Sequence, residues 1–254
     1  MRRTLLIGTV LVALFIVVFA PAGLLRTLLA PVEGVDLLHP SGTLWRGAGE
    51  LYLAERGAGQ IHWRFRPAAI LRGYIGYHLT LTGPDQTLDG NVGVSLNSYR
   101  LDLAGTLPSR FLNQWLSPYD IGMTGDVILT DVTLALFRNG NAAAPVAPNQ
   151  PTQPGLAAGE ASGYLTWAGG DVRYRLSGQD SRGTLPALVA NLGEGLEVYI
   201  YPEGGQTPLL LAQMLNNGFI KIGITRLLTR LLNNPWPGSD ADHEVVLEVE
   251  EQIF

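Results

Sequence analysis

The sequence contains no cysteine, a single lysine (Lys221) and few charged residues of either sign. The absence of cysteine excludes a disulfide framework, a thiolate metal site and a cysteine nucleophile, so an exported domain must be stabilised by its own core. The formal net charge is −5 at pH 7. Because binding to phosphates needs clustered lysine and arginine, this balance argues against a nucleic-acid partner.

The sequence also lacks the motifs of common catalytic sites. It has no Gly-x-Ser-x-Gly elbow, no Gly-x-Gly-x-x-Gly fingerprint after a strand, no P-loop and no His-Glu-x-x-His. The histidines lie in separate segments without the paired spacing of a metal site, at His39, His62, His78 and His243. We therefore predict no catalytic residues, no metal and no cofactor, in a protein that is not an enzyme.

The longest hydrophobic stretch lies near the start of the chain, directly after Arg2 and Arg3. Residues 5–25 carry no charge, and roughly 20 residues at about 1.5 Å each match a bilayer core of about 30 Å. An arginine pair is typical of the cytoplasmic flank of such a span. We predict a cytoplasmic tail over residues 1–4 and a transmembrane helix over 5–25.

This stretch places the rest of the chain across the membrane. We predict a β-rich domain over residues 31–254, in the periplasm of a bacterium and anchored to the inner membrane by one span. The alternative is a cleaved secretory signal, because Ala20-Pro21-Ala22 resembles the small-x-small pattern that signal peptidase recognises. In both interpretations the domain is exported.

Alternation of apolar and polar residues dominates the chain after the N-terminal stretch. In one run, Ile128, Val132, Leu134 and Leu136 are expected on the core face. Such alternation is typical of antiparallel strands with one face on a core and the other in water. We therefore predict a mainly β fold with a curved antiparallel sheet. Its clearest strands are 75–82, 92–97, 101–103, 128–136, 172–176 and 245–250.

A few short helices interrupt this pattern. In three segments a proline precedes a short apolar run, as is usual in the first turn of a helix. In a fourth, leucines recur at helical spacing, with arginines on the other side. The predicted helices are 67–73, 108–116, 186–192 and 225–233.

Two segments suggest an internal duplication. A Tyr-Arg-Leu string that leads into Gly-Thr-Leu-Pro occurs over 99–108 and, with a small insertion, over 174–186. The distance along the sequence between these two strings, which begin at positions 99 and 174, suits a repeated sub-sheet. We predict two similar halves, about 41–138 and 159–254. They are joined by a flexible loop over 139–158, which is rich in Ala, Pro, Asn and Gln and shows no alternation.

The most distinctive short string is Gly-Thr-Leu-Trp-Arg-Gly, from Gly42 through Trp45 to Gly47. Glycines on both sides of a tryptophan-bearing strand are typical of a bulge or of the close approach of another chain. An indole is suited to closing the end of a core. We predict a structural role for this string, with partner binding as the alternative.

Two charged strand faces complete the pattern. Residues 61–66 alternate Ile, Trp and Phe with His, Arg and Arg, so that one face is basic. We interpret this face as solvated, with contact to phospholipid headgroups as the alternative. Near the C-terminus Glu244, Glu248 and Glu250 share a face. Such a row usually protects a sheet edge from aggregation, and binding of a basic strand is the alternative.

Several of these strings occur in an order that resembles a known family. The apolar N-terminus is followed by Gly42–Gly47, by Trp63-Arg-Phe-Arg-Pro67, by Ile70-Leu-Arg-Gly73 and, near the end, by Asn233-Asn-Pro-Trp236. This order resembles protein N of the bacterial type II secretion system over essentially the whole chain. The candidate structural or partner-binding residues are Gly42, Trp45, Gly47, Trp63, Pro67 and Trp236.

The resemblance implies an accessory inner-membrane protein that helps folded proteins cross from the periplasm through the outer membrane. Its partners would be the other inner-membrane platform proteins, and the family supplies no catalytic residues. Docking would use sheet edges or charge complementarity. The family is also distantly similar to AsmA-like envelope proteins. The alternative function is therefore lipid handling in an apolar β-groove, with phospholipid as a partner.

Overall fold

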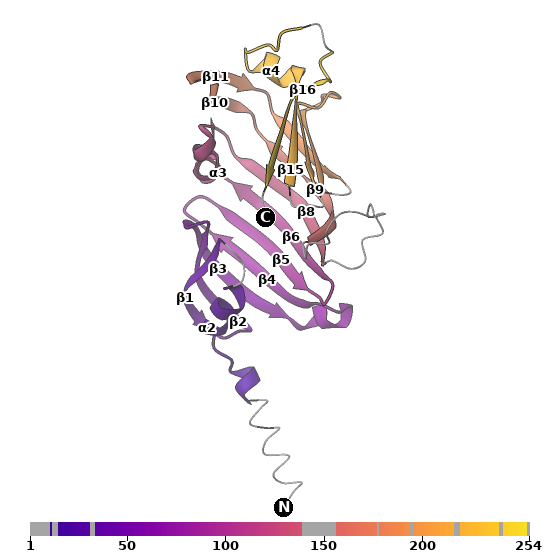
Figure 1. The fold of residues 1–254 in the computed structure, drawn as a ribbon. Coiled ribbons are helices and arrows are strands. Elements are labelled where there is room, and N and C mark those ends of the chain that lie inside the picture. Colours follow the sequence, from indigo (N-terminus) through magenta and orange to yellow (C-terminus); the bar gives the residue numbers. More distant parts are fainter. Residues whose placement is uncertain are drawn as a thin grey trace, which may run out of the picture. The chain divides into compact units, whose positions relative to one another are not determined.

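The chain forms two compact units, Met1–Asp89 and Gly90–Phe254, and the boundary between them lies within β5 (Thr87–Val94). Strands are the main secondary structure of the described residues in both units, and neighbouring strands run antiparallel (Figure 1), so the prediction of a mainly β fold is confirmed. The computed structural model describes residues 11, 15–30, 34–138, 156–176, 178–193, 196–215, 219–238 and 241–252.

The first unit is a sheet of consecutive hairpins that pair in the order β1-β2-β3-β4. The expected alternation in 61–66 is confirmed, because Ile61, Trp63 and Phe65 are at least half-buried while the basic residues between them are exposed. The elements of this unit are α2 (Gly23–Leu29), β1 (Val35–Gly42), β2 (Arg46–Leu53), β3 (Arg56–Arg66), the 3-10 helix η1 (Pro67–Arg72) and β4 (Ile75–Thr82).

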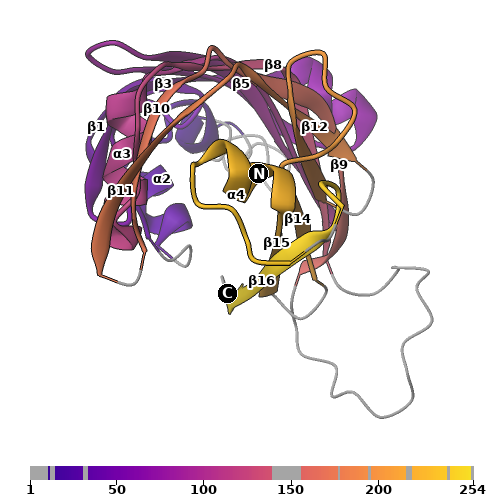
Figure 2. The same ribbon diagram turned by 90° about the horizontal axis from the view of Figure 1, so that it is seen from above.

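The core of the first unit lies between its sheet and α2. Trp63 and Leu37 are buried there together with Ala22, and Leu25 and Leu29 of α2 pack against them. Ala22, Leu25 and Leu29 recur at helical spacing, so one face of α2 is apolar and turned toward the sheet. Figure 2 shows α2 inside the curve of the sheet.

The second unit contains a large sheet in the order β6-β8-β9-β12-β13-β14-β15-β16 and a small one in the order β11-β10-β7. The strands of the large sheet are β6 (Ser98–Leu107), β8 (Val127–Arg138), β9 (Leu156–Trp167), β12 (Leu188–Gly193), β13 (Glu197–Pro202), β14 (Leu210–Met214), β15 (Phe219–Thr225) and β16 (Val245–Gln252). The remaining elements are α3 (Ser109–Leu116), η2 (Ser117–Tyr119), β7 (Gly122–Met123), β10 (Gly170–Leu176), β11 (Gln179–Leu185) and α4 (Arg226–Leu231).

The core of the second unit gathers residues from both sheets and from α4, which lies beside β14 and β15 in Figure 2. Trp167, Leu185, Leu209 and Leu228 are its buried members. The buried hydroxyl of Thr225 donates to the carbonyl oxygens that precede β14, at 2.9 and 3.1 Å, so the polar group is satisfied. This side-chain bond holds the start of α4 against the sheet.

Three of the four predicted helices are present and one is wrong. Segments 67–73, 108–116 and 225–233 contain η1, α3 and α4, and Gly73 ends η1 with φ of 81°, as expected for a glycine after a helix. Segment 186–192 instead contributes β12, which pairs with β9 and β13 on its two sides. Pairing on both edges overrides the local helix signal.

The predicted core face of β8 is also partly wrong. Ile128 was expected to point inward with Val132, but its side chain is 49% exposed, whereas Leu129 and Val132 are buried. The cause is a register shift between Thr130 and Thr133, where Asp131 has φ of 46°. An extra residue in a strand reverses the face on which all preceding side chains lie.

Several predictions fall largely outside the described residues. These are the cytoplasmic tail 1–4, much of the span 5–25 and the loop 139–158, whose last three residues begin β9. Among the residues that are described, no helix is long and apolar enough to cross a membrane. The described helical turn at 15–18 ends before Ala20, and α2 begins at Gly23. The span and the duplication of 41–138 in 159–254 stay predictions.

The buried core of the second unit yields a stability prediction. Leu209 is 1% exposed, so Leu209→Ala should lower the free energy of unfolding by about 2–5 kcal/mol through lost burial and a residual cavity. Leu96→Ala, at a site 88% exposed, should change it by less than about 0.5 kcal/mol. Urea unfolding of the full chain measures both values, and equal losses would contradict this core assignment.

Candidate functional site

The Gly42–Gly47 string forms the tight turn between β1 and β2. Trp45 lies in this turn and not on a strand, which corrects the sequence prediction. The Thr43 N–H donates to the Arg46 carbonyl at 2.9 Å, and the Arg46 N–H donates to the Thr43 hydroxyl at 3.2 Å. Gly42 has φ of 90°, a conformation that glycine adopts without strain.

This turn binds the end of the N-terminal apolar stretch. The Leu44 N–H donates to the Ala20 carbonyl at 2.8 Å, and the Ala22 N–H donates to the Gly42 carbonyl at 3.2 Å. Pro21 and Thr43 form an isolated antiparallel bridge between these two bonds. We call the assembly of residues 17–22 with residues 42–47 the N-terminal junction.

The indole of Trp45 adds a third bond to the junction. Its N–H donates to the Val17 carbonyl at 2.7 Å. The last carbonyls of a helical segment have no partner within the helix, and residues 15–18 are helical. Trp45 therefore adds a second hydrogen bond to a carbonyl at the end of this helical turn, which also accepts from the Ala20 N–H at 3.3 Å, and each such bond contributes about 1 kcal/mol net.

Trp45 packs against the first of two further aromatic rings, which form a row with it. The ring centroids of Trp45 and Phe65 are 4.8 Å apart, and those of Phe65 and Tyr77 are 5.6 Å apart, both in edge-on arrangements. The Phe65 N–H also donates to the Trp45 carbonyl at 2.7 Å. Burial raises the pKa of the Tyr77 hydroxyl, so this ring stays neutral at physiological pH.

Trp63 connects the junction to the core of the first unit. Its ring is buried, and its N–H donates to the Thr43 carbonyl at 3.1 Å. A Cβ atom on Gly47 would collide with this ring and with the Ser41 carbonyl oxygen. The groups that approach Gly47 are therefore a neighbouring strand and an indole of this chain, and the approach of another chain stays a prediction.

The structure brings together four of the six candidate residues, namely Gly42, Trp45, Gly47 and Trp63. Pro67 begins η1 two residues after Phe65. Trp236 belongs to the second unit, on the loop that follows α4, where its backbone N–H donates to the Thr229 hydroxyl at 3.3 Å. Sequence reasoning missed the N-terminal half of the junction. The signal available was the spacing of Ala22, Leu25 and Leu29.

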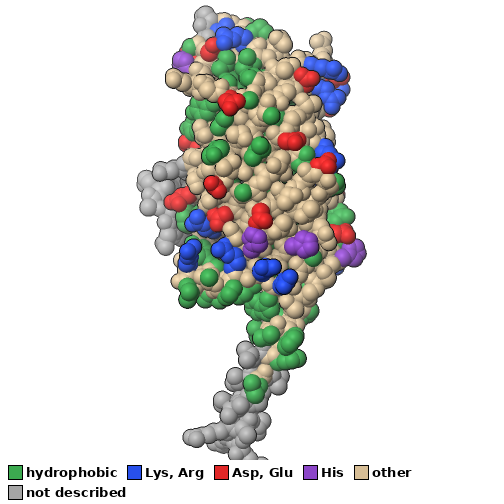
Figure 3. Space-filling view, turned by 180° about the vertical axis from the view of Figure 1, so that it is seen from behind, with side chains coloured by type: hydrophobic (Ala, Val, Ile, Leu, Met, Phe, Trp, Pro, Cys, Tyr) green, Lys and Arg blue, Asp and Glu red, His purple; other side chains and the backbone are tan. Residues whose placement is uncertain are grey.

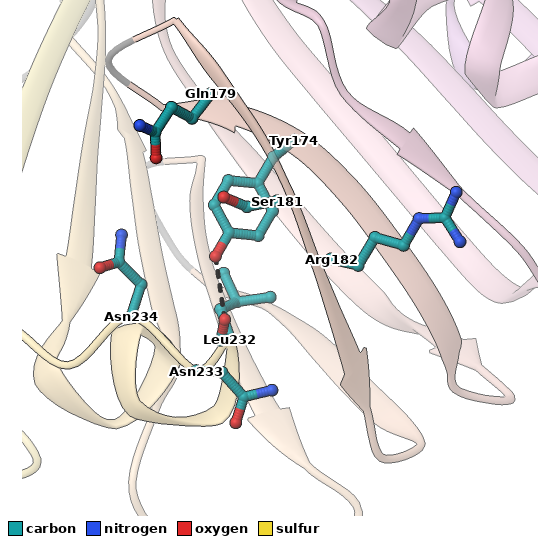
Figure 4. Close-up of a pocket in the computed structure, with 7 residues that line it drawn as sticks. All are labelled: Tyr174, Gln179, Ser181, Arg182, Leu232, Asn233 and Asn234. Carbon is teal, nitrogen blue, oxygen red and sulfur yellow. Dashed lines mark hydrogen bonds between the residues drawn. The ribbon is translucent and has the colours of Figure 1, made fainter.

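A second feature of interest is a shallow pocket of about 400 Å³ in the second unit (Figure 4). The Tyr174 hydroxyl donates to the Leu232 carbonyl at 2.9 Å, which joins the second Tyr-Arg-Leu string to the end of α4. Amide and hydroxyl groups dominate the lining, which contains no His, Asp or Glu. The lining residues are Tyr174, Gln179, Ser181, Arg182, Leu232, Asn233 and Asn234.

Charged side chains elsewhere form surface pairs. Arg175 on β10 lies 2.9 Å from Asp180 and 3.4 Å from Asp120, and its hydrogen bond to Asp180, followed by the Asp120 charge, raises the pKa of its guanidinium. Within the described part of the chain, no group of three or more His, Cys, Asp or Glu side chains is placed to hold a metal ion. The ion pairs of Arg175 are exposed and contribute little to stability.

The family model of type II secretion system protein N matches residues 33–218, which include the whole Gly42–Gly47 turn and most of the sheet strands. This chain belongs to the type II secretion system protein N family. The resemblance based on motif order is thereby confirmed, and the protein is a component of type II secretion. No curated protein and no solved structure matches the chain significantly.

The crowding around Gly47 yields a matched pair of variants. Gly47→Ala should lower the free energy of unfolding by about 1–3 kcal/mol, because backbone and a buried indole must move to admit the methyl group. Gly57→Ala, on β3, would place its Cβ 3.8 Å from the Tyr52 ring, which is ordinary contact. Urea unfolding followed by tryptophan fluorescence compares them. Equal destabilisation would contradict the close approach.

Proposed function

We propose that this type II secretion protein is held at the bacterial inner membrane by its N-terminal stretch and docks other platform proteins there. In this way it would help folded proteins pass from the periplasm across the outer membrane. The N-terminal junction is the observation that carries the proposal. Its three hydrogen bonds connect residues 17–22 directly to the turn between β1 and β2.

The junction also favours an uncleaved anchor over a cleaved signal. Ala20 and Ala22, the small residues of the candidate cleavage site, are both buried. Removal of the residues before Gly23 would leave the Leu44 N–H, the Gly42 carbonyl and the Trp45 indole without their partners. Retention of the stretch therefore stabilises the folded unit.

Strand β16 supports docking by strand addition in the second unit. It pairs with β15 on one side, and no described strand pairs with its other side. Val245, Leu247 and Val249 are all exposed on one of its faces. An exposed edge with apolar side chains is a template for an added strand, since main-chain bonds supply affinity and alternate side chains supply specificity.

The charge on the other face of β16 indicates which charge a partner strand should carry. Glu248 lies 2.5 Å from Lys221 on β15, and this hydrogen bond raises the pKa of the lysine. Glu250 follows on the same face and is exposed. With the only lysine already paired, the face is acidic, which suits a basic partner strand.

The free edge of β1 in the first unit is a poorer template. Its register shifts between Leu38 and Ser41, and His39 there has φ of 49°. Pro40 lies in the same irregular segment. Bulges and prolines are the usual features that prevent pairing at an edge. Nothing in the described residues favours the AsmA-like alternative.

The test is complementation of a strain from which the gene has been deleted. Wild-type chain should restore release of exported proteins, whereas Leu247→Lys combined with Val249→Lys should leave release near that of the deletion strain at equal protein level. Ile128→Lys is the control, because Ile128 is similarly exposed but lies on β8, which is paired on both sides. Unchanged release after the deletion would contradict the function, and full release with the double variant would contradict docking at β16.

A further inference from the structure

The η1 turn exposes two consecutive large apolar side chains. Leu71 is 91% exposed and Ile70 is 57% exposed, in a turn of only six residues. A single exposed leucine is ordinary in a folded protein. An adjacent apolar pair at the tip of a turn is different, because neither side chain packs in the core and both are available to a partner surface.

Positive charge surrounds this apolar pair. Arg66 ends β3 directly before η1, and Arg72 ends η1 directly after Leu71. Both arginines and Arg64 are exposed. From Arg56 to Pro84 the sequence contains four arginines and no aspartate or glutamate, although the whole chain has a net charge of −5. The positive charge is therefore concentrated on this part of the first unit.

The arrangement of these charges has a cost within the fold. Arg46 on β2 lies directly opposite Arg64 on β3, and no described carboxylate forms an ion pair with either of them. Like charges directly opposite each other on neighbouring strands are destabilising. Figure 3 shows blue and purple side chains gathered near the end of the unit where the N-terminal segment leaves, with green side chains beside them. A nearby anionic surface would offset the repulsion between Arg46 and Arg64.

The turn lies at the end of the sheet that holds the N-terminal junction. Phe65 donates its N–H to Trp45 and packs against that indole, and Pro67 begins η1 two residues later. Helix α2, which directly follows the junction, also exposes Leu24 and Leu28. The apolar pair, the arginines and the point where the apolar stretch leaves are thus collected at one end.

We propose that the surface formed by Arg64, Arg66, Ile70, Leu71 and Arg72 docks on the anionic phospholipid headgroups of a membrane, with the apolar pair inserted at the interface. The proposal rests on the proposed function in one respect, that the chain is held at a membrane. Apolar side chains flanked by arginine are the usual composition of interfacial anchors, because the charges meet lipid phosphates while the apolar groups enter the acyl boundary.

The test uses the full chain reconstituted in vesicles, and the absence of cysteine allows one dye to be placed at will. Ala68→Cys puts a fluorophore on η1, and Pro84→Cys puts it in the turn at the far end of β4, about 25 Å away. In vesicles of phosphatidylethanolamine and phosphatidylglycerol, lipids spin-labelled at the headgroup should quench the dye at position 68 and not at 84.

Charge variants measure the contribution of the arginines. Arg66→Gln and Arg72→Gln should each lower the ratio of docked to undocked dye about fivefold, since one basic residue near an anionic surface contributes about that factor. Arg182→Gln removes the same charge from an exposed site in the second unit and should change nothing. Ile70→Ser combined with Leu71→Ser should abolish quenching at position 68.

The outcomes separate this proposal from the one on which it rests. A chain that does not float with the vesicles would overturn both the tether and the docking surface. A chain that floats but shows no quenching at position 68 would overturn the docking surface alone. Equal quenching in pure phosphatidylcholine would overturn the role of the arginines. Shielding of the dye by added secretion proteins, without quenching by lipid, would assign the surface to a protein partner and overturn the proposal.

Discussion

The first unit depends on the hydrogen bonds that connect the turn at residues 42–47 to the end of the N-terminal stretch. Two backbone bonds and one indole bond align residues 17–22 along this turn. They bring Ala22 into the core, and α2 then continues with Leu25 and Leu29 packed against Trp63. Without these bonds the apolar stretch and the sheet would be two parts joined only by chain.

Other features of the first unit follow from that constraint. The turn must let two backbones and an indole approach closely, so Gly47 has no room for a side chain. The indole of Trp45 must lie over Phe65, which fixes the end of β3 beside the turn and places η1 there as well. The N-terminal stretch and a candidate lipid contact thereby lie at one end, where a few aromatic rings pack together.

Much of the strand pattern was predictable, because alternation is a local property of the sequence. Residues 61–66 follow it closely, whereas 75–82 form the predicted strand without the predicted alternation, since Ile75 is exposed and Gly76 is buried. The errors arose where tertiary structure decides. Segment 186–192 has a helix-like start and is a strand because β9 and β13 pair with it. The bulge at Asp131 reverses the face of Ile128, and although aspartate adopts the left-handed conformation more readily than most residues, its presence alone does not specify a bulge there.

In the candidate site, too, one part was predictable from the sequence and another part was not. The glycines around Trp45 indicated that backbone or another group has little room there, because a missing side chain is visible in the sequence. The hydrogen-bond partner of Trp45 was not predictable, since Trp45 and Val17 are 28 positions apart and their hydrogen bond involves a backbone carbonyl, which every residue has. Likewise, Leu25 was predicted to end the membrane span, and only the structure shows that it packs against the sheet of the first unit.

The most direct measurement of the central claim is hydrogen exchange at the Trp45 indole, observed by NMR on the full chain in micelles. The account predicts that this N–H exchanges slowly and with the same free energy of opening as the Leu44 and Ala22 amides, each rate being compared with that of the same group in an unfolded chain, because the three bonds open as one unit. Exchange of the Trp45 indole at the rate of free tryptophan, with Leu44 and Ala22 equally unprotected, would contradict it.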